Sequence, residues 1–433
     1  MSPKRIRRWI SRAAVALACL SILNAPPALA QCEHPMFDDP VGYITTGLWP
    51  TRVALGDLNG DDWLDMAVTS EEGSEKLSIL LNNGDGTFGS QDGYTVPPPS
   101  SVALGDVDGD EWLDIAVTLP SFDDVSILLN NGDGTFAPAV SYPAGDVPRS
   151  VAFGDVDGDE WPDMVVANAF SDDVSILLNN GDGTFADAVN YAAGNLPMSI
   201  ALGDVNGDDW IDMATANGYS DDVSILLNNG DGTFADAVSY PAGDGPQSIA
   251  VGLVDGDGWL DMAVANLHSP DVSILLNNGN GTFGATVNYH AGGHPHSVAL
   301  GDLNGDDWLD VGVADSADVA ILLNNGDGTF GSAYDYDMDG SPYSLAFGDV
   351  DGDDWLDVAA TDYRIYPDNK VWVFTSLCPN SCPADFDEDG DVDTADLLFL
   401  LGAWGTPDGD VDGDGDTDTA DLLALLAFWG DCP

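Results

Sequence analysis

The sequence predicts an all-β fold, a seven-bladed β-propeller of four-stranded antiparallel blades, followed by a small C-terminal α-helical domain. A ten-residue acidic segment, first seen at residues 56–65, occurs seven times, with five steps of 49 residues and then one of 47. Repeats of 40–50 residues that each form a small sheet stack as propeller blades, because one such sheet cannot bury both of its faces alone. The last 50 residues lack this repeat and contain instead two acidic loops, each followed by an apolar stretch.

Residues 1–30 predict a secretory signal peptide. Five basic residues precede an apolar run from Ala13 to Leu23, and Ala28-Leu29-Ala30 has the small-residue pattern of a signal-peptidase site. The pair Arg7-Arg8 is also found in twin-arginine signals, so the export route stays open. No later segment is long and apolar enough to span a bilayer. We therefore expect a mature chain starting near Gln31 that is secreted or associated with the cell surface, without membrane insertion.

The charge of the chain is strongly acidic. Removing the signal leaves five basic residues against 75 acidic ones, a net charge of −70. Such a chain repels nucleic acid and anionic membranes, and its compact state is strained unless cations bind. The charge therefore argues against a nucleic-acid partner and in favour of bound metal.

Each repeat, of which 150–198 is the clearest, combines four short apolar runs with turn residues about every 10 positions, which is typical of a small antiparallel sheet. Its expected strands are 150–153, 164–167, 174–178 and about 185–191. The turn between the third and fourth strands, Asn179-Asn180-Gly181, contains residues that tolerate the positive φ of a tight hairpin. The tryptophan of every acidic segment, such as Trp161, is expected to pack between blades or against this turn. The repeats, residues 31–378, are therefore expected to form the propeller domain.

The acidic segments offer oxygen ligands at loop positions 1, 3, 5 and 9, counted from the residue after the first glycine, and a backbone carbonyl at position 7. Hard cations that take six to eight oxygen ligands suit this pattern, and Ca²⁺ is the natural occupant. The alternative is a solvated acidic turn, which does not explain the equal spacing of carboxylates in seven copies.

With its Asp-x-(Asp/Asn)-Gly-Asp core followed by a further Asp, the loop resembles the FG-GAP/VCBS repeat of integrin α-subunit propellers and many exported bacterial proteins. The resemblance covers about residues 37–375 and implies calcium ligands in six copies: Asp57, Asn59, Asp61 and Asp65; Asp106, Asp108, Asp110 and Asp114; Asp155, Asp157, Asp159 and Asp163; Asp204, Asn206, Asp208 and Asp212; Asp302, Asn304, Asp306 and Asp310; Asp349, Asp351, Asp353 and Asp357.

Two departures from the family pattern affect these loops. Position 6 is often Gly in the family, whereas here it is Asp or Glu in every copy but the fifth. The fifth copy has Leu253 instead of the first Asp and keeps only Asp255, Asp257 and Asp261. We expect the fifth site to be weak or empty.

Residues 379–433 contain two twelve-residue loops with oxygens at positions 1, 3, 5, 7, 9 and 12 and Gly at position 6, each leading into an apolar run. This spacing is typical of EF-hand-type loops. A duplicated loop and helix of this kind resembles a dockerin domain, which implies a calcium-folded module that docks into a cohesin-type partner. Its ligands would be Asp385, Asp387, Asp389, Asp391, Asp393 and Asp396, and Asp410, Asp412, Asp414, Asp416, Asp418 and Asp421.

Four cysteines remain after removal of the signal, Cys32, Cys378, Cys382 and Cys432, an even number that suggests two disulfides in an exported protein. Composition alone leaves three pairings open. The seventh repeat lacks a fourth strand, and residues 37–43 match the fourth-strand pattern of residues 234–240 in Phe, Val and Tyr. We therefore expect the N-terminal strand to complete the last blade, which favours pairing Cys32 with Cys378 and Cys382 with Cys432.

Four of the five histidines, His268, His290, His294 and His296, fall in two successive variable stretches at the same end of the blades. This grouping raises the hypothesis of a second metal such as Zn²⁺. Histidines on Gly/Pro-rich surface loops are more often solvated, and this alternative stays open.

Two classes of function fit these features. The first is a calcium-binding adhesion, recognition or scaffold module that binds a glycan or a protein through its variable loops and is tethered by the tail. The second is a polysaccharide lyase or glycoside hydrolase on the same scaffold. No catalytic residue is identified, because nearly all carboxylates belong to metal loops and no free carboxylate pair remains for glycosidic chemistry. The recognition module is favoured.

Overall fold

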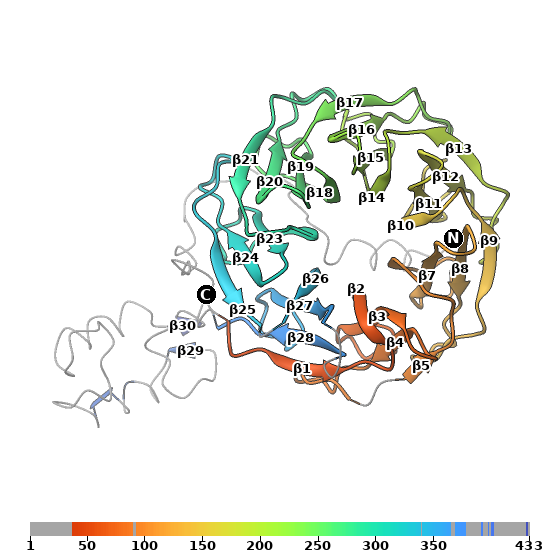
Figure 1. Ribbon diagram of the computed structural model, residues 1–433. Coiled ribbons are helices and arrows are strands. Elements are labelled where there is room, and N and C mark those ends of the chain that lie inside the picture. Colours follow the sequence, from red (N-terminus) through yellow and green to blue (C-terminus); the bar gives the residue numbers. More distant parts are fainter. Residues whose placement is uncertain are drawn as a thin grey trace. The chain divides into compact units, whose positions relative to one another are not determined.

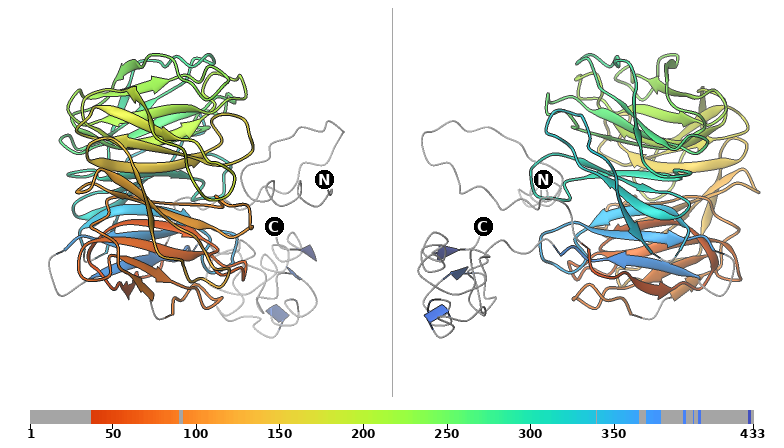
Figure 2. Two further views of the ribbon diagram at one scale, coloured as in Figure 1. Left: turned by 90° about the vertical axis from the view of Figure 1, so that its right-hand side faces the viewer. Right: turned by 60° about the vertical axis from the view of Figure 1, so that its left-hand side comes forward.

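The computed structural model describes residues 37–89, 92–338, 340–364 and 369–377, together with short stretches of the C-terminal tail. Two compact units divide the chain, and the larger, Cys32–Pro379, holds the repeats. Seven four-stranded antiparallel sheets form a closed ring in this unit, with one strand of each sheet nearest the axis (Figure 1). Seen from the side, the blades form a disc (Figure 2). The predicted seven-bladed propeller is confirmed.

Six blades are continuous in sequence, and each runs from its innermost to its outermost strand. Blade 1 is β2 (Leu48–Gly56), β3 (Asp65–Glu72), β4 (Leu77–Leu80) and β5 (Asp92–Tyr94); blade 2 is β6 (Val102–Gly105), β7 (Asp114–Leu119), β8 (Asp124–Leu128) and β9 (Val140–Pro143); blade 3 is β10 (Pro148–Gly154), β11 (Asp163–Asn168), β12 (Asp173–Leu177) and β13 (Val189–Ala192); blade 4 is β14 (Pro197–Gly203), β15 (Asp212–Asn217), β16 (Asp222–Leu226) and β17 (Val238–Pro241); blade 5 is β18 (Pro246–Gly252), β19 (Asp261–Asn266), β20 (Asp271–Leu275) and β21 (Val287–His290); blade 6 is β22 (Ser297–Gly301), β23 (Asp310–Ala314), β24 (Asp318–Leu322) and β25 (Tyr334–Asp337).

Blade 7 joins the two ends of the repeat region. It contains β26 (Pro342–Gly348), β27 (Asp357–Asp362) and β28 (Lys370–Phe374), and its outermost strand is β1 (Val41–Ile44) from the N-terminal side. The pairing of β1 with β28 is antiparallel, with Val41 opposite Val373 and Tyr43 opposite Val371. The predicted closure of the ring by residues 37–43 is confirmed, and it removes the open sheet edge that the last blade would otherwise expose.

The core lies between neighbouring blades. Strands β7 and β11, for example, are buried along their whole length, and side chains of β8 pack against those of β11 in one cluster. Each outermost strand has a tyrosine that packs edge to face against a phenylalanine of the next blade. This phenylalanine follows the third strand of that blade; Tyr142 and Phe185, for example, lie 5.5 Å apart between ring centres. Phe37 takes the same role against Tyr336 at 5.0 Å. The N-terminal segment therefore supplies the packing residue as well as the strand that blade 7 lacks.

The fourth strands are shorter than the sequence predicts. In blade 3 the strand begins at Val189, and Phe185 forms only an isolated bridge to Asn179. The residues before β13 belong instead to a tight turn, which is closed by hydrogen bonds from Asn180 N to Thr184 O at 2.8 Å and from Ala186 N to Leu178 O at 2.8 Å.

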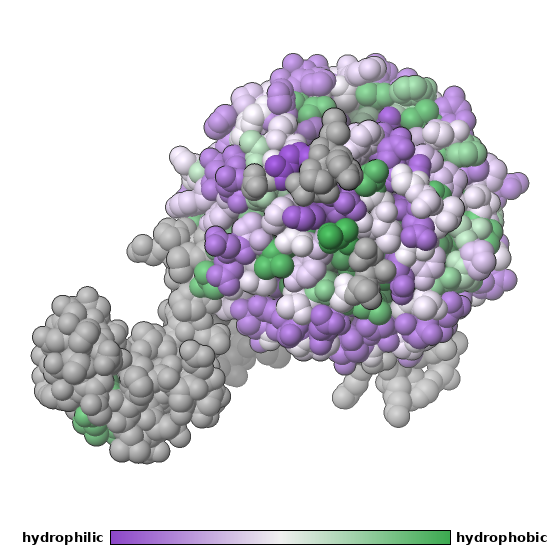
Figure 3. Space-filling model, turned by 60° about the horizontal axis from the view of Figure 1, so that its bottom comes forward, coloured by the Kyte–Doolittle hydropathy of each residue, from purple (hydrophilic) through white to green (hydrophobic). Residues whose placement is uncertain are grey.

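Hydrophilic residues cover much of one side of the ring, and hydrophobic ones form small separate patches there (Figure 3). Within the part of the chain that the structure describes, no helix is long and apolar enough to cross a membrane. In the tail, β29 (Asp391–Val392) pairs antiparallel with β30 (Gly430–Asp431). Nearly all residues of the two predicted tail helices lie outside the described residues, so the helical domain stays a prediction.

Candidate metal centres

Each acidic loop connects the innermost strand of a blade to its second strand. In blade 2, the carboxylate of Asp106 at position 1 accepts hydrogen bonds from three backbone amides of its own loop, those of Gly109 (2.7 Å), Asp110 (3.1 Å) and Glu111 (3.0 Å). The carboxylate of the position-5 residue, Asp110, accepts a hydrogen bond from the backbone N–H of Trp112 at 2.9 Å. These short-range bonds fold the chain around its own carboxylates and hold their oxygens close together.

The aspartate at position 9 is the most buried of the predicted ligands in every loop. Asp114 is fully buried at the start of β7, where its two carboxylate oxygens accept from Val107 N (2.9 Å) and Asn130 N (2.8 Å). Burial is the main cause of a large rise in the pKa of all seven such carboxyls. The pKa is about 6 for Asp65, Asp212 and Asp261, and about 7 for Asp114, Asp163, Asp310 and Asp357.

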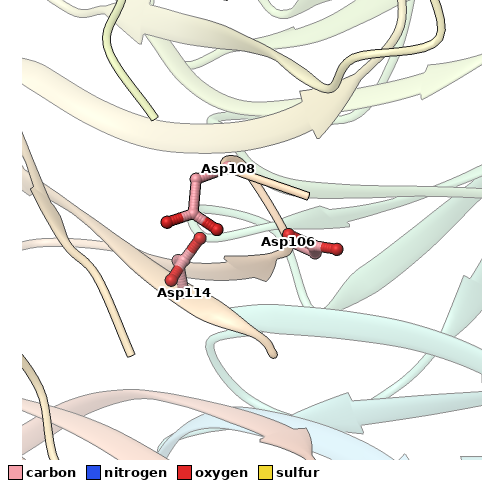
Figure 4. Close-up of side chains that lie close together, drawn as sticks. All are labelled: Asp106, Asp108 and Asp114. Carbon is pink, nitrogen blue, oxygen red and sulfur yellow. The ribbon is translucent and has the colours of Figure 1, made fainter. Parts of the chain in front are cut away.

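Three groups of aspartates in the described residues place one carboxylate oxygen each within 4.8 Å of the others. They are Asp106, Asp108 and Asp114; Asp155, Asp157 and Asp163; and Asp349, Asp351 and Asp353. In Figure 4 the carboxylates of Asp108 and Asp114 lie next to each other, with Asp106 beside them. Three other copies have Asn at position 3, and there a carboxamide oxygen takes the place of a carboxylate. All of these donors are oxygens, which fits a hard cation such as Ca²⁺.

Position 6 requires a left-handed backbone. Asp62, Glu111 and Glu160 have φ of 69°, 75° and 73°, and only the fifth copy has Gly here, Gly258 at 89°. A non-glycine residue in this region costs about 1 kcal/mol or more. The Asp or Glu that stands here in place of the family's Gly is therefore in a strained backbone conformation, which the surrounding loop maintains.

The fifth loop lacks the position-1 carboxylate, and Leu253 in its place is 40% exposed. Asp261 still accepts from Val254 N at 3.0 Å and from Asp255 N at 3.2 Å, so the loop keeps its buried anchor. It lacks the position-1 carboxylate, which in other copies accepts hydrogen bonds from several backbone amides of the loop.

An asparagine in each third-to-fourth-strand turn connects the loops of adjacent blades. Asn179 is 5% exposed, and its side-chain amide donates to Pro162 O of its own loop (3.1 Å) and to Val107 O of the preceding blade's loop (2.8 Å). The same contact recurs around the ring, including Asn82 to Val350 O at 2.7 Å between blades 1 and 7. This role was not predicted. The sequence signal for it is the first Asn of the repeated Asn-Asn-Gly, which was read only as a turn residue.

The recurring tryptophan packs as predicted, both between blades and against the turn. Trp161 contacts the loop glycine of the preceding blade, Gly109, and the turn glycine of its own blade, Gly181. A Cβ added at either glycine would come within 3 Å of the indole, 2.6 Å at Gly109 and 2.9 Å at Gly181. The metal loops and the Asn-Gly turns therefore form one continuous end of the ring.

The opposite end carries a hollow of about 230 Å³. Six blades contribute to it, largely through one position of the innermost strand, five residues before the loop glycine. We call these seven equivalent residues the channel positions: Thr51, Ser100, Arg149, Met198, Gln247, His296 and Tyr343. All but His296 line the hollow, together with Arg52, Glu71, Pro98, Pro99, Pro120, Ser121 and Tyr363.

Sequence reasoning missed the channel positions, although the repeats contain a signal for them. Residues 148–154, Pro-Arg-Ser-Val-Ala-Phe-Gly, recur in every blade as Pro-x-Ser-apolar-Ala-apolar-Gly, with Arg52 in place of Ser in the first copy. The position x differs in all seven copies, within a segment that otherwise hardly changes.

The four histidines make separate contacts. His290 is exposed beside Asp271 at 4.0 Å, and His294 Nδ1 lies 3.1 Å from Leu267 O. His296 packs against the Tyr343 ring at 4.7 Å, and burial is the main reason why its pKa falls to about 4. Among the described residues, none of the four, the exposed His268 included, belongs to a group of three close metal-binding side chains. The zinc hypothesis stays a prediction, and we do not carry it further.

The cysteines Cys32, Cys378, Cys382 and Cys432 lie outside the described residues, as do the side chains of all twelve predicted tail ligands. The two disulfides and the tail calcium sites therefore remain predictions.

The fold and its loops define a class, that of ring-closed β-propellers with an acidic, cation-compatible loop on each blade. The model of the FG-GAP-like repeat family matches residues 57–117, 106–166, 155–215, 204–264, 254–313 and 302–360. Because these matches span more than half of the chain, the protein belongs to the FG-GAP-like repeat family. Comparison with curated proteins finds no match.

Solved structures share the fold at low sequence identity. The BBS1N part of a complex with ARL6DN is 15% identical over 78% of this chain and 96% of its own, with a TM-score of 0.57. Virginiamycin B lyase from Staphylococcus aureus is 12% identical over 78% of this chain and 99% of its own, with a TM-score of 0.55. A lectin from Agrocybe aegerita that recognises non-reducing terminal N-acetylglucosamine is 22% identical over 69% of this chain and 82% of its own, with a TM-score of 0.49. At these identities, the first two show the propeller fold alone.

Proposed function

We propose that this protein is an exported, calcium-stabilised recognition module that binds a glycan or a protein at the end of the ring opposite the metal loops. The observation that carries the proposal is that the two ends of each repeat differ in how far their residues vary between copies. One end repeats the same loop, turn and inter-blade contact, whereas the channel positions at the other end differ in all seven copies. Variable residues on a rigid repeated scaffold are the usual form of a binding face.

Calcium would be held by the oxygens at positions 1, 3, 5 and 9 of six loops. The bound cation would neutralise carboxylates that otherwise repel one another, and in this way it would stabilise the loop that carries them. Among the described residues, the ion pairs Arg364–Asp362 and His290–Asp271 do not use the carboxylates at positions 1, 3, 5 and 9 of the loops. A bound cation would compensate the charge of these predicted ligands.

The N-terminal segment and the tail complete the proposal. Residues 1–30 would direct export, and residues 379–433 would bind two further calcium ions and dock into a cohesin-type receptor. With the calcium-loaded loops at one end of the ring, the variable end would be available to its ligand.

The test is a glycan array probed with the mature chain in excess calcium. Binding of a defined glycan class, lost when Arg149, Gln247 and Tyr343 are replaced together by alanine, is the expected result. Binding that survives this triple replacement contradicts the placement of the binding face. Incubation with a polysaccharide panel tests the alternative enzymatic function, since new reducing ends or unsaturated products would identify a hydrolase or a lyase.

A further inference from the structure

Basic residues are rare in this chain, and two of them lie at the channel mouth. Beyond the signal segment only five remain, Arg52, Lys76, Arg149, Arg364 and Lys370, against 75 acidic residues. Arg52 and Arg149 both line the hollow, one from β2 and the other from β10. With so many carboxylates available, two neighbouring arginines would be expected to have acidic partners if their role were structural.

Neither arginine has such a partner within the described part of the chain. The Arg52 guanidinium donates one hydrogen bond, to Thr51 O at 3.3 Å. Arg149 Nε is buried and makes none. A buried donor without a partner costs about 1–3 kcal/mol. Burial lowers the pKa of Arg52, and the nearby charge of Arg149 acts in the same direction. The lining of the hollow therefore carries two arginines against one carboxylate, that of Glu71, together with an unpaired N–H.

Arg52 also breaks the repeat at a place where packing favours another residue. The other six copies have serine here, and in five of them its hydroxyl accepts a hydrogen bond from the innermost strand of the next blade. An example is Ile200 N to Ser150 Oγ at 3.3 Å. Arginine lacks the serine hydroxyl that accepts this inter-blade hydrogen bond. Its presence therefore indicates a role in the hollow and not in the packing of one blade against the next.

Four of the channel positions lie at backbone irregularities. In blade 3 the pairing of β10 with β11 shifts between Pro148 and Ser150, which leaves Arg149 as the extra residue. The same shift falls at Thr51, Met198 and Gln247 in their blades. Bulges of this kind redirect a side chain and are frequent next to binding sites. The bulge therefore explains how this strand position faces the hollow in blades 1, 3, 4 and 5.

A column of aromatic rings holds Arg52 in place. Its guanidinium lies 5.2 Å from the centre of the Tyr343 ring, and this ring also contacts those of His296 at 4.7 Å and Tyr363 at 4.9 Å between ring centres. The Tyr363 hydroxyl donates to the Glu71 carboxylate. Because the Tyr343 ring already contacts three side chains, the column positions the arginine and leaves little room for a ligand ring to stack. The recognition chemistry in the hollow is therefore charge and hydrogen bonding.

The size and walls of the hollow suit a small polar ligand. Its volume of about 230 Å³ corresponds to roughly eight water molecules. Thr51, Ser100 and Gln247 add hydroxyl and amide groups to the two guanidiniums. Arginine binds carboxylate and sulfate groups well, because its planar N–H groups match two oxygens at once.

The negative charge of the metal loops does not prevent anion binding at this end. A channel position precedes the loop glycine by five strand residues, which corresponds to about 16 Å. This is about twice the Debye length at physiological ionic strength. Loop carboxylates are therefore largely screened at the channel mouth, whereas Arg52 and Arg149 border the ligand directly.

We propose that the channel mouth binds the carboxylate or sulfate group of an acidic sugar, with Arg52 and Arg149 as its two ligand-binding cations. This inference rests on the proposed recognition function and names the ligand class for the same end of the ring. The hydroxyl and amide groups of Thr51, Ser100 and Gln247 bind the sugar hydroxyls.

The experiment is isothermal titration of the mature chain in excess calcium with four probes: an oligogalacturonide, the neutral galactose oligomer of the same length, sodium sulfate and an acidic peptide. We expect the oligogalacturonide to bind at least tenfold more tightly than the neutral oligomer. Arg149→Gln and Arg52→Ser each weaken this binding at least tenfold, and Arg52→Ser introduces the residue that the other copies carry. Lys76→Gln removes the same charge outside the hollow and leaves binding unchanged.

Melting curves in calcium establish that the variants are folded. The proposal is overturned if the oligogalacturonide does not bind, or if either arginine variant binds it as tightly as the unchanged protein does. A preference for the acidic peptide also overturns it. Competition by sodium sulfate supports recognition of the charged group, and competition that is equally strong from the neutral oligomer contradicts it. If a glycan array instead gives neutral glycans that bind independently of both arginines, the recognition function stands and only this inference fails.

Discussion

Withdrawing calcium should reverse the pH dependence of stability. Each position-9 aspartate is buried, and its pKa rises from an ordinary 3.8 to about 6 or 7 in the folded protein without metal. One pKa unit is worth about 1.4 kcal/mol, so keeping one such carboxylate ionised costs about 3–4 kcal/mol. Seven of them would cost more than about 20 kcal/mol, whereas a domain has a total stability of about 5–15 kcal/mol. Without a cation, the fold cannot keep them all ionised.

The sign follows from the direction of the shift. A carboxyl whose pKa is raised on folding favours the folded state fully below its unfolded pKa, and this contribution is lost as the pH rises through 6 to 7. In EDTA the melting temperature should therefore fall as the pH rises from about 5 to 8. In excess calcium it should rise or stay level over the same range, because the cation binds the ionised form.

The assay is circular dichroism melting at several pH values, in EDTA and in calcium. Asp163→Asn should reduce the pH dependence in EDTA by about one seventh, since it removes one of seven such carboxyls. The matched control Asp187→Asn, at an exposed position, should leave it unchanged. A melting temperature that is independent of pH in EDTA, or the same in EDTA and calcium, refutes the reasoning.

Three further predictions follow from the same geometry. Leu253→Asp restores the missing position-1 carboxylate and should add one bound calcium per molecule by equilibrium dialysis; an unchanged stoichiometry would count against the ligand assignment. Asn179→Ala removes bonds to two carbonyls and should lower the free energy of unfolding by about 2–3 kcal/mol, whereas Asn180→Ala, at an exposed site, should cost under about 1 kcal/mol by urea titration. Non-reducing peptide mapping should give a Cys32–Cys378 disulfide, and linkage of Cys32 to another cysteine would refute the predicted covalent closure.

Much of the fold could be predicted because the same pattern of strands and loop occurs in seven copies. Seven copies of one loop at a near-constant spacing fix the number of blades. The mismatch at the ends, a last blade without a fourth strand and a Phe-Val-Tyr pattern at Phe37, Val41 and Tyr43, identified the closing strand. The register that pairs Val41 with Val373 bears this out. Local hydrogen bonds, such as those of the Asp106 carboxylate to its own loop, depend on residues close in sequence, so the pattern was enough to predict the cluster.

The sequence by itself determined the propeller, the position of each acidic loop and the strand that closes the ring, because these follow from periodicity and short-range bonding. Only the tertiary structure decided which residues meet across blades. The link from Asn179 to Val107 O spans 72 residues. Arg52 and Arg149 come together only because the ring brings the innermost strands of different blades around one hollow. The repeat marks Arg149 as a variable position and Arg52 as a departure from serine, but that the two arginines meet depends on the closure of the ring.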